Sequence, residues 1–280
     1  MSDLLPLIQK LSVLGFLLGS MSAMGLNLQP SAIAAPLRNS RLVLIALGLN
    51  FVIAPAFAWL LTVLIPLARG HAIGLLLLSG AAGAPFLPKL VTNARGDLSI
   101  AGALLVLLTA GTILFLPSAL PLMIPGLQAS AWSIARPLLL LIVAPLLVGM
   151  LVRSKATSFA VRAGPVLAII GNGCLLLLFA VLLAANFRAL IGVVGSGAIL
   201  AALLYIAGLF AMSWMAGAAH TESRGVLALA TAARNFGAAL APASASFTDP
   251  SVMTMLVVCA IVCLVVTFLA AAWIRKRQPN

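Results

Sequence analysis

The chain has 280 residues, of which 64% are hydrophobic and 7% are charged, and its mean hydropathy is +1.25. This composition excludes a soluble globular domain and indicates a polytopic membrane protein. The formal net charge of +12 does not indicate a nucleic-acid partner, because the basic residues lie mostly at the ends of apolar segments, where they set membrane topology.

Taken in chain order, the apolar segments predict about nine membrane-spanning helices, each near the roughly 20 residues that cross a bilayer. They cover residues 5–26, 40–67, 72–94, 98–124, 132–152, 159–185, 190–215, 224–247 and 250–274. No stretch is left for a soluble domain, so we expect one all-α transmembrane domain over residues 1–280. The sequence contains no catalytic constellation, cofactor motif or metal-ligand spacing, so we do not expect an enzyme.

Lysine and arginine at the segment ends predict the orientation of the helices. If the Arg275-Lys276-Arg277 tail is cytoplasmic, nine crossings place the N-terminus outside. Ten basic residues then lie on the cytoplasmic side and four outside, which favours a multi-pass protein of the cytoplasmic (inner) membrane in this orientation. Of the sixteen basic residues, the two that cannot be assigned to a loop are Lys89 and Arg234.

Lys89 follows an interruption in the third segment, Gly83-Ala84-Pro85-Phe86-Leu87-Pro88. Two prolines three residues apart remove two helix hydrogen bonds. In hydrocarbon, a broken helix and a buried charge are tolerated only where they face protein or a water-filled cavity. We therefore interpret this stretch as half of a binding site. The alternative is a lysine that snorkels to the far interface, since a straight helix would carry it about 26 Å along.

Arg234 lies ten residues into the eighth segment, roughly 15 Å deep and near the middle of the bilayer. We expect it to face protein or water, and the Pro242 that follows it fits a second interruption. The alternative is a structural arginine satisfied by backbone carbonyls. The third and eighth segments cross in opposite directions, so they fit an inverted repeat in which two broken helices meet at one site.

The acidic residues cannot neutralise these two cations. All four lie near predicted helix ends: Asp3, Asp97, Glu222 and Asp249. A buried cation without a partner recruits an anion or loses its proton, and arginine does not readily deprotonate. We therefore expect a small anionic solute that carries a carboxylate, sulfonate, phosphate or inorganic oxyanion group.

Four motifs, spread along nearly the whole chain, resemble those of the bile acid:sodium symporter family. They are Met24-Gly25-Leu26-Asn27-Leu28, Asn50-Phe51-Val52-Ile53-Ala54-Pro55-Ala56-Phe57-Ala58-Trp59, Ala94-Arg95-Gly96-Asp97-Leu98-Ser99 and Ala230-Thr231-Ala232-Ala233-Arg234-Asn235-Phe236-Gly237. The resemblance implies a panel domain (approximately 5–26 and 132–185), a core domain (approximately 40–124 and 190–274), two discontinuous helices that cross in the core, and alternating access. Ten spans are common in the family, and we expect this chain to begin at the second.

The chain departs from this resemblance where the family coordinates sodium. The family's motif Glu is Ala230 here, its motif Gln is Arg234, and the Gln of its second helix is Asn50. Lys89 lies near the end of the altered first break. Oxygen ligands, which a hard cation requires, are thus replaced at several positions. Two positively charged side chains, Lys89 and Arg234, lie near the same places. We interpret the chain as a divergent, bacterial-type member in which Lys89 and Arg234 take the place of the sodium ions.

The predicted substrate-binding residues flank the two cations. They are Lys89, Arg234, Asn235, Thr231, Asn50, Pro88, Thr92 and Phe86. The threonines and Asn235 could orient a solute by hydrogen bonds, although threonine in a membrane helix often bonds its own backbone. Phe86 and Phe236 would hold an apolar part of the solute. Asn172, between two glycines, is interpreted as a packing residue rather than as part of the path.

The sequence therefore predicts a secondary transporter of small organic anions that works by alternating access and is not coupled to sodium, since Arg234 would repel a second cation. Three alternatives stay open: a sodium-coupled organic anion symporter, a channel for oxyanions, and a non-transporting membrane protein whose cations bind an anionic lipid or a partner's carboxylate. The pattern predicts neither the solute nor the coupling ion, the direction of transport or the oligomeric state.

Overall fold

The computed structural model describes residues 4–28, 30–124, 131–185, 192–217 and 221–277, and within these ranges every regular element is helical. The elements are α1 (Leu4–Asn27), α2 (Pro30–Leu37), α3 (Ser40–Gly48), the π-helical turn η1 (Leu49–Ile53), α4 (Ala54–Leu64), α5 (Arg69–Ser79), α6 (Leu87–Asn93), α7 (Leu98–Met123), α8 (Ala131–Leu138), the π-helical turn η2 (Leu139–Val143), α9 (Ala144–Lys155), α10 (Thr157–Ala185), α12 (Ala198–Ala216), α13 (Thr221–Ala232), α14 (Phe236–Ser246) and α15 (Pro250–Arg277). The predicted all-α polytopic fold is confirmed.

Seven helical segments in the described ranges are long and apolar enough to cross a membrane. Two of the nine predicted spans are not among them. Residues 72–94 are divided between α5 and α6, as the interruption in that segment predicted. Residues 132–152 fall within α8, η2 and α9, which follow one another without a gap. The beginning of the predicted span over residues 190–215 lies partly outside the described residues.

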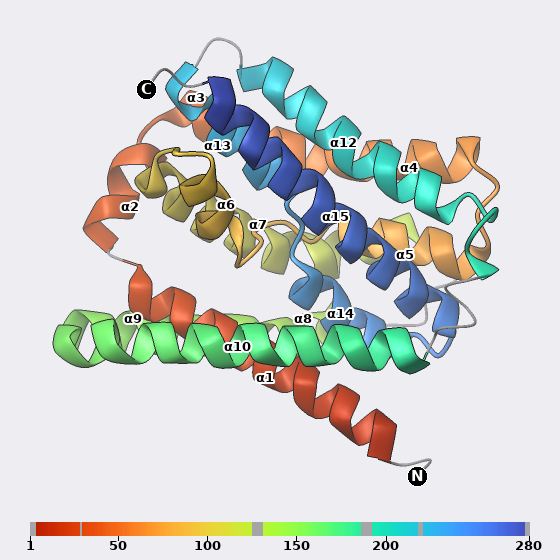
Figure 1. Ribbon diagram of the computed structural model, residues 1–280, viewed down its shortest axis with the longest axis horizontal. Helices are drawn as coiled ribbons and strands as arrows, with labels where there is room; N and C mark the ends of the chain where they lie inside the picture. The colour runs from red at the N-terminus through yellow and green to blue at the C-terminus, as the bar shows by residue number, and fades with distance from the viewer. Residues whose placement is uncertain (1–3, 29, 125–130, 186–191, 218–220, 278–280) are drawn as a thin grey trace.

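Helices α1, α9 and α10 lie along one side of the molecule, and α12, α13 and α15 lie on the other (Figure 1). Within the first group, α1 packs along both α9 and α10. Glycines make this close approach possible. A Cβ atom on Gly19 would lie 3.0 Å from the Cα of Gly171, and one on Gly25 would lie 2.2 Å from the carbonyl oxygen of Leu146. Small residues are what membrane helices use to bring their backbones this close.

Two broken helices, α5–α6 and α13–α14, contact each other and pack against α7 and α15. Helix α5 packs against α15, and α13 packs against α7. The half-helix α13 also contacts α6, while α14 contacts α5. Each half of one broken helix therefore touches a half of the other, which is the arrangement expected of two discontinuous helices that cross.

The breaks coincide only in part with the prolines that marked them in the sequence. Pro85 lies in the first break, as predicted, but Pro88 and Pro242 lie in helices. Helix α5 ends at Ser79 and α6 begins at Leu87, so Pro88 lies in the first turn of α6, where its missing N–H costs no helix hydrogen bond. The predicted interruption at Pro242 is wrong, because Pro242 lies inside α14, which has already restarted at Phe236. The second break instead comprises residues 233–235, at Arg234 itself.

We expect Gly25→Ala to weaken the packing of α1 against α9, because the added Cβ would meet a backbone oxygen that cannot rotate away. The expected cost is about 1–3 kcal/mol, seen as a lower thermal unfolding midpoint of the purified protein in detergent. Gly173→Ala in α10 is the control, since no atom lies within 4 Å of its added Cβ. Equal midpoints for the two variants would contradict this account of the α1–α9 contact.

Candidate functional site

The first break, between α5 and α6, is held by two threonines of α7. The Ala82 N–H donates to Thr112 Oγ1 at 2.8 Å, and that hydroxyl lies 3.1 Å from the Ala82 carbonyl oxygen, which accepts from it. Gly83 has a φ of +78°, and a Cβ atom there would lie 2.5 Å from Thr109 Oγ1. Glycine is therefore required at this position, both by the backbone conformation and by the space. The break is an ordered structure in which buried hydroxyls replace helix hydrogen bonds.

The second break joins the first through Asn235. The Asn235 backbone N–H donates to the Ala81 carbonyl at 2.9 Å, and its side-chain Nδ2 donates to the Gly83 carbonyl at 3.0 Å. Its Oδ1 accepts from the Ala238 N–H at 3.0 Å, which caps the start of α14. Because one fully buried asparagine makes all three bonds, the two breaks are fixed relative to each other.

Arg234 lies at the same crossing and has no exposed surface. Its Nη2 donates to the Ser79 carbonyl, and its Nε donates to the Leu78 carbonyl at 3.3 Å. Its Nη1 donates to Asn50 Oδ1 at 2.8 Å and to the Thr231 carbonyl at 3.3 Å. The guanidinium thus links the end of α5, the end of α13 and the π-helical turn η1.

Asn50 reaches this cation from η1, the widened turn that precedes Pro55. Its Nδ2 donates to the Ala46 carbonyl at 2.9 Å and to Thr231 Oγ1 at 3.3 Å, which leaves Oδ1 to accept from Arg234. Thr231 Oγ1 in turn donates to the Leu227 carbonyl at 3.0 Å. The amide and hydroxyl are therefore committed to contacts within the protein, and both side chains are fully buried.

The charge of Arg234 is balanced by neutral oxygens rather than by an acid. Its partners are three backbone carbonyls and one amide oxygen, and within the described ranges no acidic side chain forms an ion pair with it. The carbonyls of Leu78 and Ser79 belong to the last turn of α5, the end at which the helix dipole is negative. The Leu78 carbonyl also accepts from the Ala81 N–H at 3.0 Å. Such a set of oxygens is also what coordinates a hard metal cation.

The acids that can be placed cap helices, as expected. Asp97 Oδ1 accepts from the Ser99 N–H at 2.6 Å at the start of α7, and Asp249 Oδ1 accepts from the Ser251 N–H at 2.8 Å at the start of α15. Asp3 and the side chain of Glu222 lie outside the described residues.

Lys89 lies in a different environment, a cavity of about 350 Å³ beside the first break. Helices α1 and α10 line one side of this cavity, and the α5–α6 break, α6 and α7 line the other. Its apolar wall includes Phe16, Met24, Phe86 and Leu175, and its polar lining includes Ser20, Asn27, Asn172 and Lys89. No acidic residue is among the lining residues, so Lys89 carries the charge of the cavity.

The structure therefore separates the predicted site residues into two groups. Lys89, Phe86 and Pro88 line the cavity. Asn50, Thr231, Arg234 and Asn235 form the buried network at the crossing and do not line it. Arg234 has the contacts of the alternative considered for it, an arginine satisfied largely by backbone carbonyls.

Two further residues considered in the sequence analysis, Thr92 and Phe236, do not line the cavity. Thr92 is exposed, its hydroxyl donates to the Pro88 carbonyl at 2.9 Å, and it does not line the cavity. Phe236 is buried in an apolar cluster with Phe16, Phe86 and Leu175, which themselves border the cavity. Phe236 thus supports the apolar wall from behind.

Sequence reasoning missed the polar residues that the two groups of helices bring to this place. Asn27 and Asn172 are exposed residues that line the cavity from α1 and α10, whereas Asn172 was interpreted as a packing residue. Thr109 and Thr112 hold the first break from α7. The available signal was an asparagine or threonine inside an otherwise apolar span, which is costly unless it has a partner or meets water.

Two crossing broken helices, a buried fixed cation and an adjoining cavity are the features of a secondary transporter with its binding region at a helix crossing. The chain belongs to the sodium bile acid symporter family, whose model matches residues 13–193. The matched residues include the first break and end before α12. Members of this family are membrane transporters of organic anions rather than enzymes. No curated protein matches the chain by sequence.

We expect Arg234→Met to destabilise the protein strongly, because methionine fills much of the space but donates nothing to the four oxygens. Each buried acceptor left without a donor costs about 1–3 kcal/mol, so the thermal unfolding midpoint in detergent should fall steeply. Arg162→Met, which removes an exposed arginine from α10, should change it little. If the two variants unfolded at the same temperature, Arg234 would not stabilise the crossing.

Proposed function

We propose that this protein is a secondary transporter that carries small organic anions across the cytoplasmic membrane by alternating access, without coupling to sodium. The observation that carries the proposal is the contact set of Arg234. Its guanidinium occupies a nest of neutral oxygens at the ends of α5 and α13, next to a cavity that presents a lysine.

The absence of sodium coupling follows from electrostatics. Oxygens that would coordinate a sodium ion already accept hydrogen bonds from Arg234. A second positive charge about 4 Å from the guanidinium would be repelled by roughly 4 kcal/mol at an effective dielectric constant of 20. The arginine would therefore supply permanently the positive charge that sodium supplies to other family members only when bound.

Lys89 is proposed to contact the anionic group of the solute. It is exposed at the cavity, where an ammonium group has three donors and no acidic neighbour among the lining residues. Asn27 and Asn172 could accept or donate hydrogen bonds to other polar groups of the solute. The phenyl rings of Phe16 and Phe86 favour a solute with an apolar body. Arg234 would act from behind the cavity wall by holding the two breaks in place.

Alternating access is proposed to come from movement between the two sides of the cavity. One side consists of α1 and α10, and the other consists of the α5–α6 break, α6 and α7. We propose that residues 5–26 and 132–185 act as the panel and that residues 40–124 and 190–274 act as the core. The bonds of Arg234 and Asn235 all lie within the proposed core, so they would persist during such a movement.

The orientation is proposed from the distribution of charge. The end of α9 and the beginning of α10 lie at one end of the molecule, as do the beginning of α3 and the end of α15 (Figure 1). These segments carry Arg153, Lys155, Arg162, Arg41 and the basic C-terminal turn. By the positive-inside rule, this end faces the cytoplasm.

The test is uptake of radiolabelled carboxylates and sulfonates into proteoliposomes prepared without sodium. We expect Lys89→Gln to lower uptake at sub-saturating solute about tenfold or more, because losing a hydrogen bond to a charged group costs about 1.5–3 kcal/mol. Lys155→Gln, which removes an exposed lysine at the end of α9, is the control and should transport normally.

Three results would contradict the proposal. Solute binding without flux would favour a non-transporting protein, and single-channel currents would favour an oxyanion channel. Equal transport by the two lysine variants would remove Lys89 from the solute path.

A further inference from the structure

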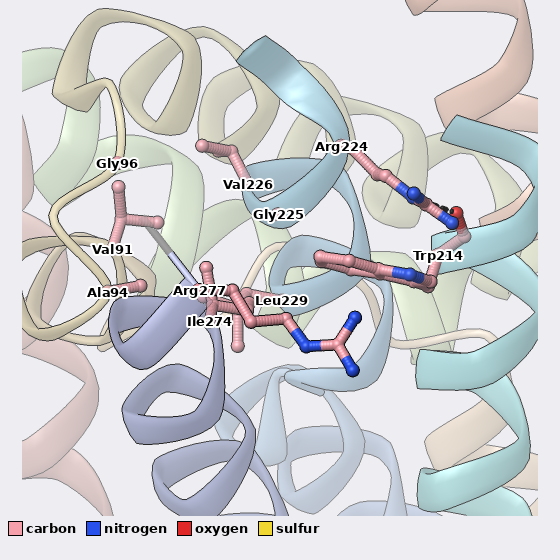
Figure 2. A pocket seen from close by; sticks show the side chains of 10 residues that line it. All are labelled: Val91, Ala94, Gly96, Trp214, Arg224, Gly225, Val226, Leu229, Ile274 and Arg277. Atoms are coloured by element: carbon pink, nitrogen blue, oxygen red, sulfur yellow. Dashed lines mark hydrogen bonds between the residues drawn. The ribbon is translucent and has the colours of Figure 1, made fainter. Parts of the chain in front are cut away.

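A second basic cavity lies on the other side of α6 from the one that holds Lys89. Its volume is about 230 Å³, and its walls come from the end of α6 and the turn after it, from α12, from α13 and from α15 (Figure 2). Val91, Val226 and Ile274 are among its apolar lining residues, and Arg224 and Arg277 are its charged ones. The proposed transport path does not use this cavity.

Two tryptophans hold the arginines of this cavity in place. The Arg224 guanidinium carbon lies 4.3 Å from the centre of the Trp214 ring, and its Nε donates to the Trp214 carbonyl at 2.7 Å. The Arg277 guanidinium carbon lies 4.1 Å from the centre of the Trp273 ring. The two indoles themselves meet edge to face, with centroids 4.9 Å apart. Such stacking orients a guanidinium while leaving its edge donors available.

Within the part of the chain that the structure describes, most donors at these edges have no protein partner. Apart from the bond between Arg224 Nε and the Trp214 carbonyl, no hydrogen bond or ion pair joins either guanidinium to the described residues. Among the lining residues that the structure describes, none is acidic. Arg224 also lies in the first turn of α13, the end at which a helix dipole favours an anion. Charge and donor geometry both favour one anionic group with several acceptor oxygens.

We propose that this cavity is a second anion site, which binds a phosphate group through the edge donors of Arg224 and Arg277. Guanidinium forks match the oxygens of phosphate, and a cavity of about 230 Å³ is smaller than those that enclose drug-sized ligands. The phosphate can belong to the headgroup of an anionic phospholipid or to a soluble phosphate ester. Both fit a basic cavity at the end of the molecule where α15 ends.

The second cavity and the cavity of the proposed transport path border the same short helix, α6. Helix α6 has seven residues, and it presents Pro88 and Lys89 to the first cavity and Val91 to the second. A phosphate group in the second cavity would therefore rest against the helix that carries the proposed solute contact. The binding proposal itself does not depend on transport, and it can hold whether or not Lys89 contacts a solute.

The experiment measures phosphate binding by the full-length protein in detergent. Glycerol 3-phosphate, the polar part of an anionic phospholipid, is titrated at constant ionic strength, and its affinity is read from the shift in thermal unfolding midpoint. Retention of phosphatidylglycerol against phosphatidylcholine is measured by native mass spectrometry. Both measurements are also made on Lys89→Ala, which removes the charge of the first cavity and separates the two anion sites.

We expect Arg277→Gln to weaken binding at least tenfold, and Arg224→Gln to do the same. Arg275→Gln is the matched control, because it removes the same charge from the same exposed tail without touching the cavity. Lys89→Ala should keep the part of the binding response that Arg224→Gln and Arg277→Gln remove, because only binding at the first cavity is lost in it. A response confined to glycerol 3-phosphate supports a soluble ester as the ligand, and one confined to phosphatidylglycerol supports a lipid. Binding of neither probe, equal losses in Arg275→Gln and Arg277→Gln, or complete loss of binding in Lys89→Ala would overturn the proposal.

Discussion

A permanently charged side chain with no exposed surface imposes the strictest demand on this structure. Arg234 cannot give up its charge, so the chain must bring oxygens to it. They come from the end of one broken helix, from the end of the other, and from the π-helical turn that carries Asn50. Each of these elements leaves regular α-helical geometry where it meets the guanidinium. The breaks and the cation therefore depend on each other. Ordinary helices would offer no free carbonyls, and without the cation the buried Ser79 carbonyl would lose the side-chain donor that it has here.

The two basic residues within the predicted membrane spans, Arg234 and Lys89, have different surroundings. Arg234 is surrounded by protein and stabilises the crossing, whereas Lys89 is exposed at a cavity between two groups of helices. The same short helix α6 that presents Lys89 also borders the cavity of Arg224 and Arg277. Basic residues of this chain therefore do more than set membrane topology at helix ends, because they also line the two cavities beside α6.

The sequence was sufficient to predict the class of fold and the regions of the two breaks, because apolar length and misplaced charge are local properties. It placed a break before Lys89 and predicted that the segment with Arg234 is interrupted, although at Pro242 rather than at Arg234 itself. The partners of Arg234 could not be predicted, since Leu78, Ser79 and Asn50 reach it only through tertiary contacts. The proline signal also failed at Pro242, because a proline can continue a membrane helix whose break occurs about two turns earlier, at a buried arginine.

The replacement of a sodium ion by Arg234 is tested most directly by a sodium titration of the thermal unfolding midpoint, with potassium at equal ionic strength as the reference. The account predicts no sodium-specific shift for the wild-type protein. It predicts a sodium-specific rise for Arg234→Gln, because the carbonyls of Leu78, Ser79 and Thr231 and the amide oxygen of Asn50 would then be free to coordinate the ion. Sodium-specific stabilisation of the wild-type protein would contradict it.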